Sequence, residues 1–177
     1  LNDRIRLRTR GLYEALEYFN ESLALDPMFA HAHAGMASVY WLLTSYDVSL
    51  DRNVWFDKAE ASAKFALEID SESVRALGAL AAVYSKRGDI EHAADLFDRI
   101  RLIGVGDSDV ISWEATLHLR LGYFEVLIQS LSVQQRRDPF NEIISWALAD
   151  ALIFSGRPAE AIVILEGLQD FTHRDYY

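Results

Sequence analysis

The sequence predicts an all-α fold, built as a solenoid of antiparallel helix pairs, and three observations carry this prediction. The chain has 177 residues and is 51% hydrophobic, yet it contains only 3 prolines and 9 glycines that could interrupt helices. Small residues recur with a spacing of 34 residues. Glycine and proline stand at fixed places between these recurrences. Few helix breakers and a repeat of this length indicate stacked helical units.

Small residues recur at two places in each unit. The first series is Ala37, Ala81, Ala115 and Ala149, of which the last three are 34 residues apart. The second series is Ala15, Ala59, Ala93, Leu127 and Ala161, whose last three steps are again 34 residues. Because small side chains let two helices approach closely, we expect these residues at the contact between the two helices of each pair.

Glycine and proline indicate where the helices end. Gly88, Gly122 and Gly156 follow the first helix of three units, where a glycine can adopt the left-handed conformation that caps a helix. Asp26-Pro27 and Asp138-Pro139 follow the second helix of two units. Proline lacks an N–H and clashes with the preceding turn, so it stops a helix.

This period and pattern resemble the tetratricopeptide repeat (TPR) over residues 12–175. The resemblance implies a right-handed superhelix whose concave face is lined by the first helix of each pair. It divides the chain into a linker or partial first helix at 1–11, followed by a solenoid at 12–177. The units are 12–29 (partial), 30–73, 74–107, 108–141 and 142–175. The sequence departs from the family at position four of the units, where the usual tryptophan is His33, Leu77, Ile111 and Ser145.

One unit carries ten extra residues, because Ala37 and Ala81 are 44 residues apart. The surplus is placed at 44–53, between the two helices. Similar long units occur in repeat domains attached to bacterial nucleotide cyclases and to winged-helix transcription regulators. The residues that carry this likeness are Pro27, Phe29, Ala30, Ala32, His33, Ala34, Gly35, Ala37 and Tyr40. It implies that the chain is the regulatory part of a larger bacterial signalling or transcription-regulating protein.

Family geometry also implies which side chains line the concave face and contact a partner. These candidates are His31, Ser38, Trp41, Leu42, Arg75, Lys86, Asp109, Thr116, Arg120, Trp146, Asp150, Ile153 and Phe154. Aromatic and aliphatic anchors among small residues suit an apolar peptide or helix of another protein. Lys and Asn are missing at the positions with which chaperone-binding repeats clamp a terminal carboxylate, so that subclass is not expected. For Trp41, Leu42 and Phe154, packing against the insertion or a neighbouring helix is the alternative reading.

Charge and chemistry narrow the functions that the sequence supports. A net charge of −10 disfavours nucleic acid as a partner, and the absence of cysteine excludes disulfides and thiol chemistry. His31 and His33 point apart on a helix, and Gly104-Val105-Gly106 lacks the context of a phosphate loop, so it is interpreted as a turn. We therefore expect no enzyme activity, no cofactor and no metal site. No stretch is long and apolar enough to span a membrane, and we expect a cytoplasmic scaffold.

Two other functions remain open at this stage. The module could act by homodimerisation, because the end faces of a solenoid expose apolar surface unless they are capped. It could also sense a small ligand, if the inserted unit closes a pocket near Trp41 and Trp55.

Overall fold

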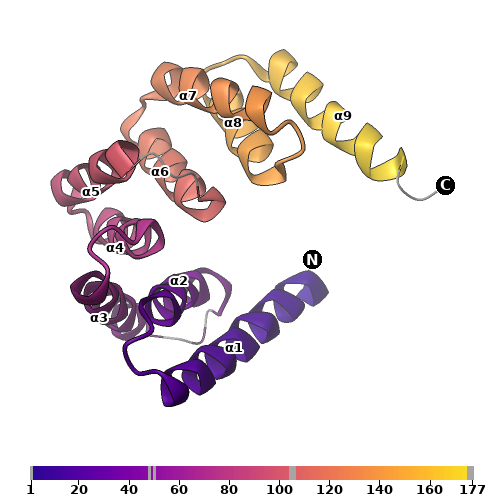
Figure 1. The fold of residues 1–177 in the computed structure, drawn as a ribbon. Coiled ribbons are helices and arrows are strands. Elements are labelled where there is room, and N and C mark those ends of the chain that lie inside the picture. Colours follow the sequence, from indigo (N-terminus) through magenta and orange to yellow (C-terminus); the bar gives the residue numbers. More distant parts are fainter. Residues whose placement is uncertain (1, 48, 50, 104–106, 175–177) are drawn as a thin grey trace. The chain divides into compact units, whose positions relative to one another are not determined.

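The computed structural model describes the backbone of residues 2–47, 49, 51–103 and 107–174. It describes the side chains of the same ranges apart from those of 2–5, 108–109 and 169–174. Within these ranges the chain is helical, without a strand (Figure 1). The helices are α1 (Asn2–Leu25), α2 (Ala30–Tyr46), α3 (Arg52–Ile69), α4 (Val74–Arg87), α5 (Ile90–Ile103), α6 (Ser108–Leu121), α7 (Phe124–Arg137), α8 (Glu142–Phe154) and α9 (Pro158–Arg174). The predicted all-α class is confirmed.

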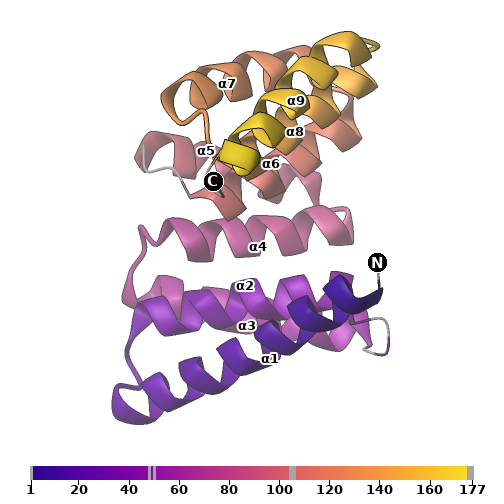
Figure 2. The ribbon, with the colours of Figure 1, turned by 90° about the vertical axis from the view of Figure 1, so that its right-hand side faces the viewer.

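The chain forms two compact units, Leu1–Val110 and Ile111–Tyr177, and the division falls inside α6. In the first unit α2 packs against α1, α3 and α4, and α4 packs against α5. Figure 2 shows α2 and α4 side by side, with α3 behind α2. In the second unit α8 packs against both α7 and α9.

The predicted small residues lie at the centre of the packing. Ala37, Ala59, Ala81 and Ala93 have 0% of their surface exposed. In the second unit the same two series remain buried in one apolar core that also includes side chains of α6, α7, α8 and α9. The members of the two series in that core are Ala115, Leu127, Ala149 and Ala161. Their burial confirms that the period of the sequence marks the helix contacts.

The helices end where glycine and proline predict. Gly88, Gly122 and Gly156 have φ angles of 88°, 75° and 82°, which is the left-handed region. The N–H after each glycine donates to a carbonyl five residues back, as in the 2.9 Å bond from Asp89 to Tyr84. Likewise, α1 and α7 each end directly before an Asp-Pro pair.

The ten extra residues of the long unit are distributed over three places. Against the 14-residue helices α4 and α5, α2 has 17 residues and α3 has 18. The segment 47–51 between them accounts for the remaining three, because only residues 88–89 separate α4 from α5. More of the surplus therefore extends helices than lengthens the turn.

These extended helix ends contact α1, which is one continuous helix through the residues predicted as a linker or partial first helix. The hydroxyl of Tyr13 donates to Asp47 at 2.8 Å, and Arg8 donates to the Tyr46 hydroxyl at 3.0 Å. The ring of Trp55 lies edge-on to Tyr13, with ring centres 6.4 Å apart. The insertion thus adds polar contacts to the first helix, beside the apolar packing of α1 on Met36, Val39 and Leu43 of α2.

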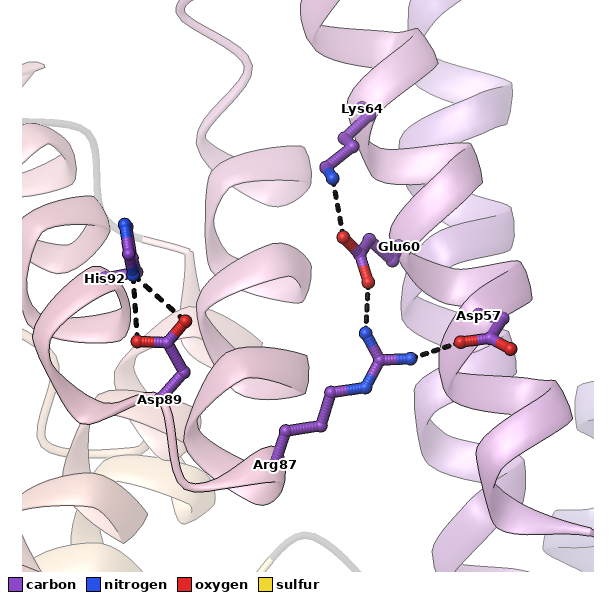
Figure 3. Close-up of polar contacts among 6 residues, drawn as sticks. All are labelled: Asp57, Glu60, Lys64, Arg87, Asp89 and His92. Atoms are coloured by element: carbon purple, nitrogen blue, oxygen red, sulfur yellow. Dashed lines mark hydrogen bonds and ion pairs between the residues drawn. The ribbon is translucent and has the colours of Figure 1, made fainter.

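A cluster of ionic groups joins α3 to α4 (Figure 3). Arg87, at the end of α4, forms ion pairs with both Asp57 and Glu60 of α3, and Lys64 pairs with Glu60 at 2.6 Å. Burial alone would raise the pKa of Glu60, but hydrogen bonds from Lys64 and Arg87 outweigh it and lower the pKa. These pairs lie near solvent, so they contribute less to stability than the buried alanines do.

Gly78 in α4 marks a very close approach of two helices. A Cβ atom at this position would overlap Cγ2 of Val110 and would lie 3.1 Å from its Cγ1. Val110 is buried, and its branched side chain has little freedom to rotate away. The close contact therefore favours glycine at this position, although glycine has a low helix propensity.

We predict that Gly78→Ala lowers the free energy of unfolding by roughly 1–2 kcal/mol, because the clash exceeds the gain in helix propensity. Gly11→Ala is the matched control, since a Cβ in the middle of α1 would meet nothing within 4 Å. That control should gain up to about 1 kcal/mol. Urea unfolding measures both, and a stabilising Gly78→Ala would contradict the close approach.

Ser145 occupies position four of the last unit, where the repeat family has tryptophan. Its side chain is completely buried, and its hydroxyl has no hydrogen-bond partner among the described residues. The neighbouring core is aliphatic and includes Ile144 and Leu148. A buried hydroxyl that has lost water without gaining a partner reduces stability.

We predict that Ser145→Ala raises the free energy of unfolding by about 1 kcal/mol, because the desolvated hydroxyl is removed while the helix is kept. Thermal or urea unfolding measures the change. Ser38→Ala serves as the comparison, because the Ser38 hydroxyl is buried but donates to the Ala34 carbonyl at 3.1 Å. A loss of stability in Ser145→Ala would show that its hydroxyl has a partner.

Candidate functional site

Helix α8 is apolar on its solvent-facing side as well as on its buried side. It begins at Glu142 and is capped by Asn141, whose side chain accepts a hydrogen bond from the N–H of Ile144 at 3.2 Å. Alanine and leucine fill its inner face. On the opposite side, Ile143, Trp146 and Ile153 are 38%, 56% and 48% exposed. A helix that is apolar all round is ordinarily buried all round, so this exposed side is unusual.

These exposed residues follow one another along a single helix face. Their numbers increase by three and seven, and Asp150 lies between Trp146 and Ile153 on the same face. We call Ile143, Trp146, Asp150 and Ile153 the α8 stripe. It is a nearly continuous apolar surface that includes one carboxylate.

Asp150 has no ion pair or hydrogen bond to any other described residue. Loss of solvent raises the pKa of its carboxyl, and no neighbouring charge is the cause. The side chain is still partly exposed, so the carboxylate keeps some water. The stripe therefore holds an ionisable group that its own fold leaves unpaired.

Phe154 follows the stripe and has a partner of its own. It is 64% exposed, and its ring stacks on Phe124 of α7, with ring centres 6.3 Å apart and an angle of 13° between the planes. The alternative reading for Phe154, packing against a neighbouring helix, describes this contact. The sequence analysis missed Phe124, because no spacing pattern relates residues on two different helices.

The remaining candidates of the second unit lie on α6. Thr116 is half-buried, and its hydroxyl donates to the carbonyl of Ser112 at 2.9 Å, while Arg120 is exposed. Asp109 also lies on α6 but belongs to the first unit, and its side chain lies outside the described residues.

In the first unit the structure separates the candidates into exposed and buried groups. His31, Arg75 and Lys86 are exposed and Leu42 is half-buried, whereas Ser38 and Trp41 are only 3% and 8% exposed. Ser38 and Trp41 therefore contribute to packing in this structure and offer little surface to a partner.

His31 and Arg75 line a cavity of about 680 Å³ at the start of α2 and α4. The ring of His31 stacks on Phe29 at 5.8 Å, and Arg75 forms a 2.8 Å ion pair with Asp107. Phe19 of α1 also lines this cavity. The sequence pattern indicated neither Phe19 nor Asp107 as a lining residue.

A second cavity, of about 670 Å³, lies between α1 and the end of α2. The insertion contributes Tyr46 and Asp47 to its lining, and α1 contributes Tyr13. Trp41 and Trp55, which the sequence suggested for a ligand pocket, do not line it.

The described residues also bear on metal binding and on membrane insertion. No group of three or more His, Cys, Asp or Glu side chains could hold a metal ion there. None of the described helices is both long and apolar enough to cross a membrane.

Comparison with known proteins places the fold. No protein-family model and no curated protein matches the sequence. Among solved structures, the chain is similar to YrrB, a TPR protein described as having an unusual peptide-binding site. The identity is 18%, the TM-score is 0.56, and the match covers 88% of this chain and 75% of that one. A TPR protein from Parabacteroides merdae matches with 19% identity and a TM-score of 0.64, over 93% of this chain and 60% of that one.

The fold is that of a tetratricopeptide-repeat domain. The resemblance to this repeat that the sequence suggested is therefore confirmed for the TPR fold. The finer likeness to repeat regions of nucleotide cyclases and winged-helix regulators stays a prediction. The set of partner-binding residues also stays a prediction, although the structure gives their positions in the TPR fold.

We predict that Asp150→Asn raises the melting temperature at neutral pH, because it removes a charge that the fold desolvates without pairing. An acid whose pKa is raised on folding destabilises the fold above that pKa, and the penalty disappears once pH falls below the ordinary value of 3.8. The gain should therefore vanish below pH 3.8. Melting curves of both proteins across this range measure it, and a gain that persists at low pH would contradict the desolvation.

Asp89→Asn is the control of opposite sign. A hydrogen bond from His92 at 2.8 Å lowers the pKa of Asp89, and the same bond raises the pKa of His92 (Figure 3). Between the ordinary values of 3.8 and 6.5, Asp89 is ionised and His92 protonated, so losing this pair should lower the melting temperature. The side chains of His92 and Asp89 are 67% and 45% exposed, so the effect should be small.

Proposed function

We propose that this chain is a protein–protein interaction module that binds a peptide or helix of another protein on the first helices of its pairs. The observation that carries the proposal is the α8 stripe, where Ile143, Trp146 and Ile153 expose apolar surface on the side that does not pack within the unit. Soluble chains rarely leave such side chains in a row unless a partner covers them.

The composition of the stripe suits recognition. Tryptophan is the side chain most often found at energetic hot spots of interfaces, and aliphatic neighbours exclude water around it. When one helix binds another protein, apolar residues spaced three and four apart along one of its faces make the contact. We propose a non-catalytic role for the chain.

The structural neighbours support the same function. One of them, YrrB, is described as a TPR protein with a peptide-binding site. By analogy of fold, we propose the exposed candidates within each unit as further contact residues for a partner. In the second unit these are Arg120 of α6 and Phe154 at the end of α8. In the first unit they are His31, Arg75 and Lys86, with Leu42 partly accessible.

We further propose that the module regulates a larger bacterial signalling or transcription protein in the cytoplasm. The support is the run of residues from Pro27 to Tyr40 together with the ten-residue insertion that follows it. Sequencing the complete reading frame tests this part, since a frame without any output domain would contradict it. The peptide-binding proposal does not depend on the outcome.

We predict that Trp146→Ala weakens binding of a cognate peptide by about 2 kcal/mol or more, or roughly 30-fold in Kd, because it removes the largest anchor. The cognate peptide is obtained by selection from a displayed random peptide library, and Kd is measured by fluorescence polarisation. Tyr18→Ala is the matched control, because Tyr18 is a 69% exposed aromatic residue on α1. It should leave Kd unchanged.

The melting temperature of Trp146→Ala should stay near that of the parent, since an exposed side chain contributes little to folding. Equal Kd values for Trp146→Ala and the parent would overturn the proposed surface. Light scattering of the parent across a wide concentration range tests homodimerisation, the alternative. A dimer that Trp146→Ala dissociates would show that the stripe binds a second copy instead of a foreign peptide.

A further inference from the structure

The α8 stripe contains one charge, and that charge has no partner among the described residues. Asp150 makes no ion pair or hydrogen bond with the described residues, and its neighbours along the stripe are Trp146 and Ile153. Loss of solvent already raises the pKa of its carboxyl in the uncovered chain. A partner that covers Trp146 and Ile153 would remove more water from the carboxylate between them.

Covering an unpaired carboxylate with apolar groups is costly, whereas pairing it with a cation offsets that cost. A purely apolar partner would therefore be disfavoured on this stripe. An acidic partner would be disfavoured further, because the chain carries a net charge of −10. A basic partner avoids both costs, because its cation pairs with the carboxylate and is attracted by the net negative charge.

Resting on the proposed function, we propose that the ligand of the α8 stripe is a peptide segment in which apolar side chains flank a single lysine or arginine that pairs with Asp150. Asp150 then acts as the specificity residue of the surface, and Trp146 and Ile153 bind the apolar groups on either side of the basic residue.

The helix geometry fixes the approximate spacing in such a peptide. Trp146 and Asp150 are one turn apart, about 6 Å along the axis, and Asp150 and Ile153 are about 4.5 Å apart. An extended peptide advances about 6.6 Å in two residues, which matches an apolar side chain two positions from the basic one. A helical ligand would instead place its apolar residues three or four positions away.

The experiment is a selection of displayed random 12-residue peptides against the whole chain, carried out in parallel on the parent, Asp150→Lys and Glu166→Lys. Glu166 is an exposed acid on α9, so its change alters the net charge equally at another place. The parent and Glu166→Lys should enrich the same peptides, with Lys or Arg between apolar residues. Asp150→Lys should lose these peptides and enrich ones with Asp or Glu at that position.

Binding of the best peptide then tests the pair directly. Asp150→Asn should raise Kd tenfold or more, and exchanging the peptide's basic residue for glutamate should weaken binding to the parent and restore it to Asp150→Lys. Circular dichroism melting of each variant confirms that the fold is intact. If Asp150→Lys does not fold, the Kd of the best peptide for Asp150→Asn tests the inference by itself.

The outcomes separate this inference from the proposed function. Selected peptides without a basic residue, or with equal affinity for the parent and Asp150→Asn, overturn the inference. If Trp146→Ala still abolishes their binding, the peptide-binding surface stands. If Trp146→Ala has no effect, or if nothing is enriched and the chain dimerises, both proposals fail.

Discussion

Close contact between helices at small side chains is the constraint on which the rest of the structure depends. The paired helices of the first unit meet where Ala37, Ala59, Ala81 and Ala93 are fully buried, and any larger side chain there would push the helices apart. Gly78 is a still tighter place, where even a methyl group would overlap Val110. Once these contacts fix which faces are buried, the faces left for function are fixed as well.

The insertion shows how such a stack tolerates extra residues. The ten additional residues lengthen α2 and α3 and the segment between them, whereas the alanines of the pair, Ala37 and Ala59, stay fully buried. The longer ends are in contact with α1, which has 24 residues and reaches them through Tyr13 and Arg8. A long first helix and a long second pair are thus matched in length, and the insertion contributes to packing of the fold.

Most of the fold could be predicted from the sequence because its signals are local and periodic. The spacing of alanines locates the buried faces, and Gly88, Gly122 and Gly156 act within a single turn of the chain. The sequence also placed Trp146 and Ile153 among the candidates for the concave face, and both are exposed.

Contacts between elements were not predictable in the same way. Position in the repeat did not indicate that Trp41 is buried, nor that Phe124 lies against Phe154, nor that Asp107 pairs with Arg75. Each of these depends on how far a side chain from another helix or loop reaches. The division of the insertion between helix and turn also depends on tertiary contacts, because its sequence is compatible with both.

Corresponding positions of α4 and α8 show what packing alone requires. Positions five, nine and twelve of α4 are Gly78, Ala82 and Ser85, which are small and buried. The same positions of α8 are Trp146, Asp150 and Ile153, which are large and exposed. Exposed positions are free to be polar, and polar residues there would favour solubility at no cost in packing.

The tryptophan and isoleucine of α8 are therefore not demanded by the folding of their own unit, and the proposed recognition of a partner supplies a physical reason for them. In that proposal a single acid among them makes recognition selective. It adds nothing to the stability of the fold, and it makes every partner without a matching cation harder to bind.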